Sequence, residues 1–313
     1  MAPTPKTLTY KTAGNLEIPL DVYLPSNASN VPILLWFHGG GLLQGHRSKI
    51  APHMLRSVEK YKHCLVSADY RLAPQVGIQE IFEDVRDCVT FVRSKDGLSK
   101  ALGSEGSVDT GRLAVSGSSA GGYLAFLAGL YCEPKPQLLL PIYPITDPLG
   151  TFFANSQPAP TLKNGEVDFT KKIPDDLVAP FTDRTAPVVA NNDPGARDNM
   201  YAYMMDRANL ASLLHLNTTN RPYHDTNNDR WRIAKQIKAR GLPPTYVVHG
   251  DLDRAVGIEQ ADEVVGLMVG LGMEIRYERV GGKDHLWDQF EEGEKLEGLY
   301  GFMHGKFEGK AKI

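Results

Sequence analysis

Positive charge is not in excess in this sequence, and no long apolar run occurs in it. The 313 residues include 34 Lys and Arg against 37 Asp and Glu, so the formal net charge is -3. A surface for nucleic acid or an anionic membrane needs a basic excess, and a membrane span needs about 20 apolar residues. No basic N-terminal segment leads into an apolar core, as a secretory signal would. We therefore expect no nucleic-acid partner, no membrane span and no secretion.

Cysteine is scarce, and the three cysteines lack the spacing of a metal site. Cys64 and Cys88 fall within apolar patterns, so we expect buried, reduced thiols and no metal. A reducing compartment follows, and the cytoplasm is the expected location. The peroxisome is the alternative, because the C-terminal Ala311-Lys312-Ile313 loosely resembles the Ser-Lys-Leu address.

Glycine frames one serine in the segment Gly117-Ser118-Ser119-Ala120-Gly121. The segment follows an apolar run, Leu113 to Val115, and precedes an apolar helical pattern from Tyr123 to Tyr131. Gly-x-Ser-x-Gly between a strand and a helix is the pattern of a nucleophile elbow, where the serine sits on a sharp, strained turn. Glycine is needed where two backbones meet closely, because a Cβ would clash. The same residue types also make ordinary turns, so the rest of the chain must decide.

Strand and helix patterns alternate along the chain, which favours a mostly parallel sheet covered by helices. Ile33 to Phe37 is a continuous apolar run, as expected of a central strand buried on both faces. From residue 78 to 92, apolar residues recur every three or four positions and predict an amphipathic helix. Further strands are expected at 7–10 and 20–24, as a possible antiparallel opening, and at 64–68, 113–115, 138–142, 246–248 and 275–277. Further helices are expected near 227–240, 258–270 and 288–304.

Residues from about 149 to 228 break this alternation. Pro, Asn and Asp are frequent in the segment, and aromatic residues are scattered through it. So long a stretch between two strands is better explained as an inserted subdomain than as a loop. We expect a core at 1–148 and 229–313 and a cap at 149–228. The helical part of the cap, near 197–214, is rich in Met and aromatic residues, which either line a pocket or form the cap's own core.

Catalysis by a serine requires donors for the oxyanion, a base, and a carboxylate that orients the base. His38-Gly39-Gly40-Gly41 directly follows the strand that ends at Phe37. Consecutive glycines leave backbone N–H groups free to converge on a developing oxyanion. A phosphate-binding loop is the alternative for a glycine run, but neither a P-loop lysine nor the dinucleotide-binding spacing is present.

Candidates for the acid and the base follow two later strands. Asp251 and Asp253 come after the strand at 246–248, and a cap for the helix that begins near Ile258 is the alternative role for a carboxylate there. His285 follows Gly281-Gly282 after the strand at 275–277, at the sheet edge where α/β sites assemble. A lone loop histidine is usually a solvated surface residue. The order of Ser119, Asp253 and His285 along the chain is, however, the order of nucleophile, acid and base in α/β-hydrolases.

These motifs together resemble the hormone-sensitive-lipase-like branch of the α/β-hydrolase fold. The Asp-Tyr-Arg-Leu-Ala-Pro string, about thirty residues beyond the glycine run, is a distinctive hallmark of that branch. The resemblance covers roughly residues 31–147 and 241–290 and leaves out the insert. Its segments are His38-Gly39-Gly40-Gly41, Asp69-Tyr70-Arg71-Leu72-Ala73-Pro74, Gly117 to Gly121, Tyr143-Pro144-Ile145-Thr146-Asp147, and the pair Asp253 and His285. It implies a mostly parallel sheet flanked by helices, with an inserted cap.

The resemblance also implies roles for the matched residues. Ser119 is the nucleophile, because taking Ser118 would break the glycine frame. The family pattern His-Gly-x-x-Asp selects Asp253 as the acid, with Asp251 in reserve, and His285 is the base. In similar esterases the oxyanion donors are the second and third glycines of the run and the residue after the serine. Here these are the N–H groups of Gly40, Gly41 and Ala120, whereas His38, Asp69 and Arg71 are expected to be structural.

Three departures from the family pattern affect the surroundings of the site. Ser118 stands where this branch commonly has aspartate, which alters the polarity beside the elbow. Only about thirty residues precede the central strand, so we expect the insert at 149–228 to provide most of the cover. Leu286-Trp287 follows His285 where phenylalanine is frequent, which concerns the pocket wall.

The expected activity is that of a serine carboxylesterase acting on small to medium, moderately apolar esters, with no metal or organic cofactor. One alternative is lactone, amide or formamide hydrolysis, or acyl transfer, on the same site. The other is a non-catalytic ligand-binding receptor of this fold, which the presence of serine, acid and histidine disfavours. The sequence predicts neither the physiological substrate nor the oligomeric state.

Overall fold

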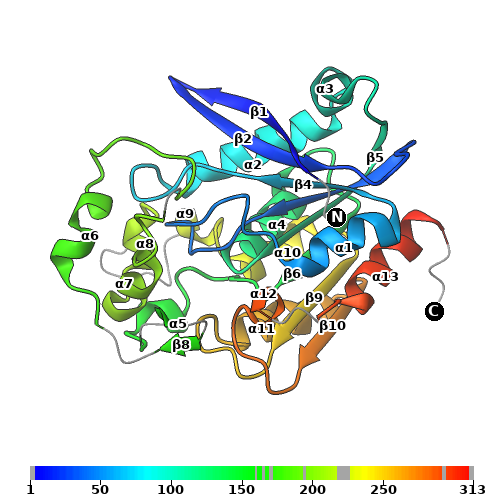
Figure 1. Cartoon of the computed structure of the whole chain (residues 1–313). Coiled ribbons are helices and arrows are strands. Elements are labelled where there is room, and N and C mark those ends of the chain that lie inside the picture. The colour runs from blue at the N-terminus through cyan, green and yellow to red at the C-terminus, as the bar shows by residue number, and fades with distance from the viewer. Residues whose placement is uncertain are drawn as a thin grey trace.

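Figure 1 shows the computed structural model of the chain. The described residues are 4–158, 161–163, 166–168, 172–192, 195–216, 226–290 and 294–309. The C-terminal tripeptide that resembles a peroxisomal address lies outside them.

A single eight-stranded sheet forms the centre of the molecule (Figure 1), in the order β1-β2-β4-β3-β5-β6-β9-β10. The strands are β1 (Lys6–Ala13), β2 (Leu16–Tyr23), β3 (Val31–Phe37), β4 (Cys64–Ala68), β5 (Val108–Ser118), β6 (Leu138–Ile142), β9 (Thr245–Gly250) and β10 (Ile275–Val280). The pairs β1–β2 and β2–β4 are antiparallel, and every other pair is parallel. The mostly parallel sheet and its antiparallel opening are therefore confirmed.

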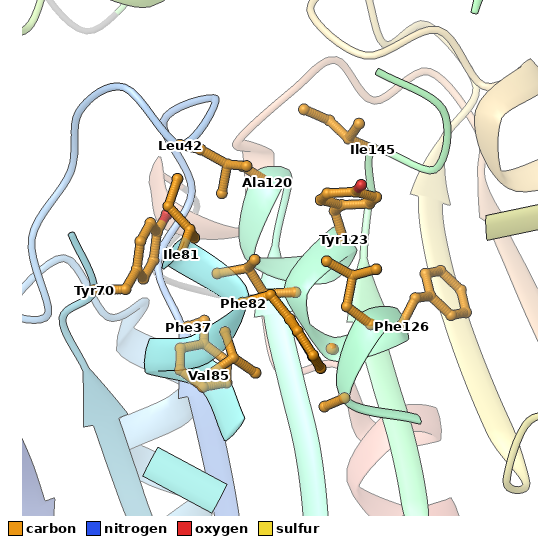
Figure 2. Packing of buried hydrophobic residues seen from close by; sticks show 14 of the residues in the cluster. Phe37, Leu42, Tyr70, Ile81, Phe82, Val85, Ala120, Tyr123, Phe126 and Ile145 are labelled. Carbon is orange, nitrogen blue, oxygen red and sulfur yellow. The ribbon is translucent and has the colours of Figure 1, made fainter. Parts of the chain in front are cut away.

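Helices cover both faces of the sheet. They are α1 (Pro52–Tyr61), α2 (Ile78–Arg93), a π-helical turn at Lys95–Ser99, α3 (Lys100–Leu102), α4 (Ala120–Tyr131), α10 (Ile233–Arg240), α11 (Glu259–Gly270), α12 (Trp287–Phe290) and α13 (Glu297–Phe307). The seven residues of β3 are all buried. Because side chains alternate across a strand, Ile33, Leu35 and Phe37 join a core with α2 and α4, while Leu34 and Trp36 join a core with α1 and α13. Figure 2 shows Phe37 of the first core beside Phe82 and Val85 of α2.

The helix predicted at 78–92 is present as α2, with its apolar positions buried. Three other predictions differ in detail, because each predicted helix is two. The helix predicted near 197–214 is α7 (Met200–Arg207) and α8 (Leu210–Leu213), since Ala208 adopts a left-handed φ of 52° and ends α7. The one at 227–240 is α9 (Thr226–Asp229) and α10, and the one at 288–304 is α12 and α13. Helix α1 was not predicted.

The residues between β6 and α10 contribute no described strand to the central sheet. They form α5 (Thr151–Ala154), the small hairpin of β7 (Thr161–Lys163) and β8 (Glu166–Asp168), α6 (Asp175–Thr182), α7, α8 and α9, which gather at one side of the molecule (Figure 1). Met200, Met204 and Leu210 are buried in the same apolar cluster as α2 and α4. The packing of this insert is thus continuous with that of the sheet, and the boundary at 149–228 stays a prediction. None of the helices within the described ranges is long and apolar enough to cross a membrane.

Candidate active site

Ser119 lies at the turn between β5 and α4, with a φ of 58° and a ψ of -119°. This is a strained conformation for a residue other than glycine. The flanking glycines permit the turn: a Cβ at Gly117 would lie 2.1 Å from the Gly121 carbonyl group, and one at Gly121 would lie 1.9 Å from the Phe37 oxygen. The Ser119 N–H donates to the Ile142 carbonyl at 2.9 Å. The expected strand–turn–helix elbow is therefore present, and its serine is only 2% exposed.

The glycine run leaves β3 and lies against the elbow. We call residues 38–45, which include two of the expected oxyanion donors, the oxyanion loop. A Cβ at Gly39 would lie 3.2 Å from the Ser119 Cβ. Gly40 and Gly41 have φ values of 102° and 67°, which favour glycine. Within the described residues, no hydrogen bond is found from the N–H groups of Gly40, Gly41 or Ala120. Free N–H groups beside a serine suit the binding of an oxyanion.

The residues around His38 hold the oxyanion loop in place. The His38 ring stacks on Tyr70 with 4.3 Å between ring centroids, and the Tyr70 hydroxyl donates to the His38 carbonyl at 2.9 Å. Burial lowers the pKa of His38, so its ring is neutral at ordinary pH. Asp69 is fully buried and accepts from both the N–H and the guanidinium of Arg47. Arg71 pairs with Asp84 of α2. These contacts agree with the structural roles expected of His38, Asp69 and Arg71.

Asp253 and His285 meet at the carboxyl ends of β9 and β10. We call residues 251–256, which follow β9 and include both candidate acids, the acid loop. His285 Nδ1 lies 2.7 Å from Asp253 Oδ2, and His249 Nε2 lies 3.2 Å from the same oxygen. The other carboxylate oxygen accepts the N–H groups of Ala255 and Val256 at 2.9 and 2.8 Å. Burial alone would raise the pKa of Asp253, but the electrostatic interaction with His285 and the hydrogen bonds from His249 and His285 hold it well below its usual range. The Asp253 carboxylate is therefore ionised at neutral pH.

The structure distinguishes the two candidate aspartates. Asp251 is exposed, and its carboxylate accepts the Gly282 N–H at 2.7 Å. It therefore ties the acid loop to the loop that carries the histidine, and it does not contact the imidazole. Asp284 pairs with Arg254 across the same two loops. Asp253 is the carboxylate that the structure brings to His285.

The end of β6 lies between the serine and the histidine. Ile142 accepts the Ser119 N–H, and the ring of the next residue, Tyr143, lies 4.5 Å from the His285 ring between centroids. No hydrogen bond between Ser119 Oγ and His285 is found in the described part of the chain. Ser118, which replaces the usual aspartate, is fully buried and accepts from the Trp36 indole at 3.3 Å. It therefore faces the core that contains Trp36.

Two side chains of the insert reach these loops, and the sequence did not identify them individually. Arg197 is 5% exposed and donates to the carbonyls of Leu43 and Ala73 and to the Gln75 side chain. Its burial lowers its pKa to about 10. Tyr201, in α7, contacts both the oxyanion loop and the acid loop. The aromatic character of the insert was the signal that pointed to Tyr201, whereas no pattern pointed to Arg197.

The described residues contain no group of three or more His, Cys, Asp or Glu side chains arranged to hold a metal. Cys64, Cys88 and Cys132 are buried free thiols. Burial raises the pKa of each thiol, to about 12 for Cys132. None of them is therefore disposed to act as a thiolate nucleophile.

A family model and several curated proteins are similar to this chain. The family model BD-FAE matches residues 20–157. Among curated proteins, the non-reducing polyketide synthase Preu6 of Preussia isomera is 28% identical over 300 residues, which cover 90% of this chain and 14% of that protein. The synthase atr1 of Stereocaulon alpinum is 26% identical over 303 residues, which cover 90% of this chain and 12% of that one. The chain thus spans about one seventh of the length of the curated relatives that it matches.

Solved structures share the fold over nearly the whole chain. An α/β-hydrolase superfamily protein from Enterococcus faecalis has a TM-score of 0.69 and 18% identity, and 99% of each chain is covered. The thermophilic carboxylesterase EstE1, cloned from a metagenomic library, has a TM-score of 0.63 and 21% identity, covering 99% of this chain and 90% of that one. An esterase from Thermogutta terrifontis phosphonylated by sarin has a TM-score of 0.63 and 19% identity, covering 99% and 94%. The predicted α/β-hydrolase fold is confirmed, and solved carboxylesterases are among the structures whose fold this chain shares.

Proposed function

Given this fold, we propose that the chain is a serine hydrolase that cleaves carboxylic esters through an acyl-enzyme. The observation that carries the proposal is the 2.7 Å contact between His285 Nδ1 and Asp253 Oδ2, formed at the sheet edge where Ser119 sits on its elbow. The contact leaves the second imidazole nitrogen, Nε2, available for the serine hydroxyl. The match to an esterase-like family model supports the same reaction class.

Each group has one task in the proposed reaction. His285 removes the proton of Ser119 as the oxygen attacks the ester carbonyl, and Asp253 fixes the imidazole tautomer and stabilises its cation. The N–H groups of Gly40, Gly41 and Ala120 bind the oxyanion, and losing one such donor typically costs about 3 kcal/mol of transition-state stabilisation. His285 then protonates the leaving alcohol. Water activated by the same histidine hydrolyses the acyl-enzyme.

We propose further that the insert at 149–228 is the cap that selects the substrate. Its described Met and aromatic side chains, together with the nearly complete burial of Ser119, favour small to medium, moderately apolar esters. The buried free thiols fit a reducing location, for which the cytoplasm stays the prediction.

Acyl transfer or release from a thioester is a second candidate for the same site. The similarity to polyketide synthases over 90% of this chain favours it, because a serine hydrolase attacks thioesters by the same addition and elimination. The two candidates share Ser119 and His285. Release from a thioester differs from ester hydrolysis in the leaving group, and acyl transfer differs in the acceptor that replaces water.

Steady-state hydrolysis tests the proposal. The wild-type chain and Ser119→Ala are each assayed with p-nitrophenyl butyrate and with the butyryl thioester of N-acetylcysteamine. We expect turnover by the wild type and none by the variant above the buffer rate. The ratio of kcat/KM for the two substrates decides between ester and thioester. Equal turnover by the variant and the wild type would reject the proposal.

A further inference from the structure

Tyr201 joins the two loops that flank the candidate site. Its backbone N–H lies in the first turn of α7 and donates to the Gln44 side chain of the oxyanion loop at 2.9 Å. Its hydroxyl donates to the Ala255 carbonyl of the acid loop at 2.6 Å. Its ring also packs so closely on the oxyanion loop that a side chain at Gly41 would clash with it, because a Cβ there would lie 2.6 Å from a ring carbon. One residue of the insert thus contacts both the oxyanion loop and the acid loop.

The strand order places this bridge over the nucleophile. The oxyanion loop follows β3 and the acid loop follows β9, while β5 and β6 lie between those strands. Ser119 stands at the end of β5. A side chain that contacts both outer loops must therefore cross the edge of the sheet at which the serine lies. The low solvent exposure of the three side chains agrees with a cover formed by Tyr201. Ser119 is 2% exposed, and Tyr201 and His285 are each 9% exposed.

The hydroxyl of Tyr201 is suited to hold this position. Burial raises its pKa well above the ordinary value, and the negative charge of Asp253 raises it further. The group therefore stays protonated and remains a donor to Ala255. That carbonyl belongs to the residue whose N–H binds the Asp253 carboxylate. The hydroxyl consequently braces the acid loop, while the ring lies against Gly41 of the oxyanion loop.

We propose that Tyr201 is the specificity-determining residue of this site and sets the upper length of the acyl group that can lie over Ser119. The inference rests on the proposed ester hydrolysis. It adds the residue that limits the acyl chain and the expected change in chain-length preference when that residue is replaced. Removing the ring opens room for longer acyl chains, whereas removing only the hydroxyl loosens the acid loop without changing the space. The two parts of the side chain thus have separable effects.

Tyr203 offers a matched control on the same helix. It lies two residues further along α7 and is partly exposed, and its ring packs against Arg207 at 5.5 Å. No described contact of Tyr203 reaches the oxyanion loop or the acid loop. A substitution there changes α7 on its more exposed side and leaves Tyr201 in place.

The test compares Tyr201→Ala, Tyr201→Phe, Tyr203→Ala and Tyr203→Phe with the wild type on p-nitrophenyl acetate, butyrate, octanoate and laurate. Because each methylene in an apolar pocket changes kcat/KM about tenfold or more, we expect Tyr201→Ala to raise the octanoate-to-acetate ratio by about tenfold or more. Tyr201→Phe should lower kcat/KM for all esters and keep the wild-type ratio. Both Tyr203 variants should keep the ratio and the rates within about twofold, as expected of a surface change.

Three results would overturn the inference. An unchanged ratio in Tyr201→Ala, with an active wild type, rejects the role of Tyr201 and leaves the esterase proposal intact. An equal change of ratio in Tyr203→Ala shows a general effect of loosening α7, and also rejects it. A wild type that neither turns over any ester nor reacts with a fluorophosphonate rejects both proposals. Tyr201→Leu, which retains apolar bulk near the backbone, replaces Tyr201→Ala if that variant does not fold, and carries the same expected direction.

Discussion

The hydroxyl of Tyr143 donates a hydrogen bond to the carboxylate of Asp288, with 2.6 Å between the two oxygens. Asp288 is fully buried and stands three residues after His285. Its other oxygen lies 3.0 Å from His53 Nε2 of α1, and the ring of Tyr143 lies 4.5 Å from that of His285. The segment that carries the candidate base is therefore fixed to two other elements by a buried polar network.

Replacing Asp288 should destabilise the fold strongly. Asp288→Ala leaves His53 and the Tyr143 hydroxyl buried without their partner, which typically costs about 3–5 kcal/mol for a buried pair. The measurement is the free energy of unfolding from urea denaturation. Glu297→Gln is the control, since the Lys60–Glu297 pair is more than half exposed and its loss should cost less than about 1 kcal/mol. Equal, small losses for the two variants would contradict the buried network.

The two candidate aspartates should differ in catalysis. Asp253→Asn keeps the shape of the side chain but removes the charge at His285, so we expect kcat to fall by about 10⁴-fold, as in other triads. Asp251→Asn removes a charge that does not contact the imidazole and keeps a side-chain oxygen that can accept the Gly282 N–H, so a change of less than about tenfold in kcat is expected. Steady-state kinetics with p-nitrophenyl butyrate measure both. A larger loss in Asp251→Asn would reverse the assignment of the acid.

The Asp253 carboxylate should make stability depend on pH in a defined direction. Its pKa in the folded chain lies below that of the unfolded chain, about 3.9. Its contribution is therefore fully present above about pH 4–5 and is lost as the pH falls towards the folded-state pKa.

The free energy of unfolding of wild type and Asp253→Asn measures this contribution between about pH 6 and pH 3. The difference should shrink as the pH falls, because other carboxylates titrate equally in both chains. A difference that stays constant over this range would contradict the depressed pKa of Asp253.

The glycine at the start of α4 should not tolerate a side chain. Gly121→Ala places a Cβ 1.9 Å from the Phe37 carbonyl oxygen, so we expect a loss of about 3 kcal/mol or more, or failure to fold. Gly266→Ala is the matched control, because this exposed glycine of α11 has no atom within 4 Å of the added Cβ. There alanine should stabilise the helix by about 0.8 kcal/mol. Thermal unfolding measures the stability of both variants. A Gly121→Ala variant as stable as the wild type would show that the elbow is less tightly packed than described.

Local patterns predicted much of the fold and of the candidate site. The continuous apolar run at Ile33 to Phe37 and the helical period from Ile78 to Val92 each depend on neighbours in the chain, and both elements are present. The elbow at Ser119 is equally local, because five consecutive residues form the turn and its close backbone contacts require glycine at both ends.

Contacts between distant segments were not predictable in the same way. His53 and Asp288 are 235 residues apart, and Tyr201 and Ala255 are 54 apart. No periodicity encodes which buried polar groups meet across such intervals. The break of the predicted 197–214 helix at Ala208 likewise depends on a left-handed backbone that alanine does not signal in sequence.

The central claim is that Ser119 is the nucleophile, and intact-mass spectrometry after treatment with a fluorophosphonate tests it most directly. Wild type, Ser119→Ala and Ser118→Ala are labelled side by side, because Ser118 is the adjacent buried serine and serves as the matched control. The account predicts a single adduct on wild type and on Ser118→Ala, and none on Ser119→Ala. An adduct on Ser119→Ala formed at the wild-type rate would contradict it.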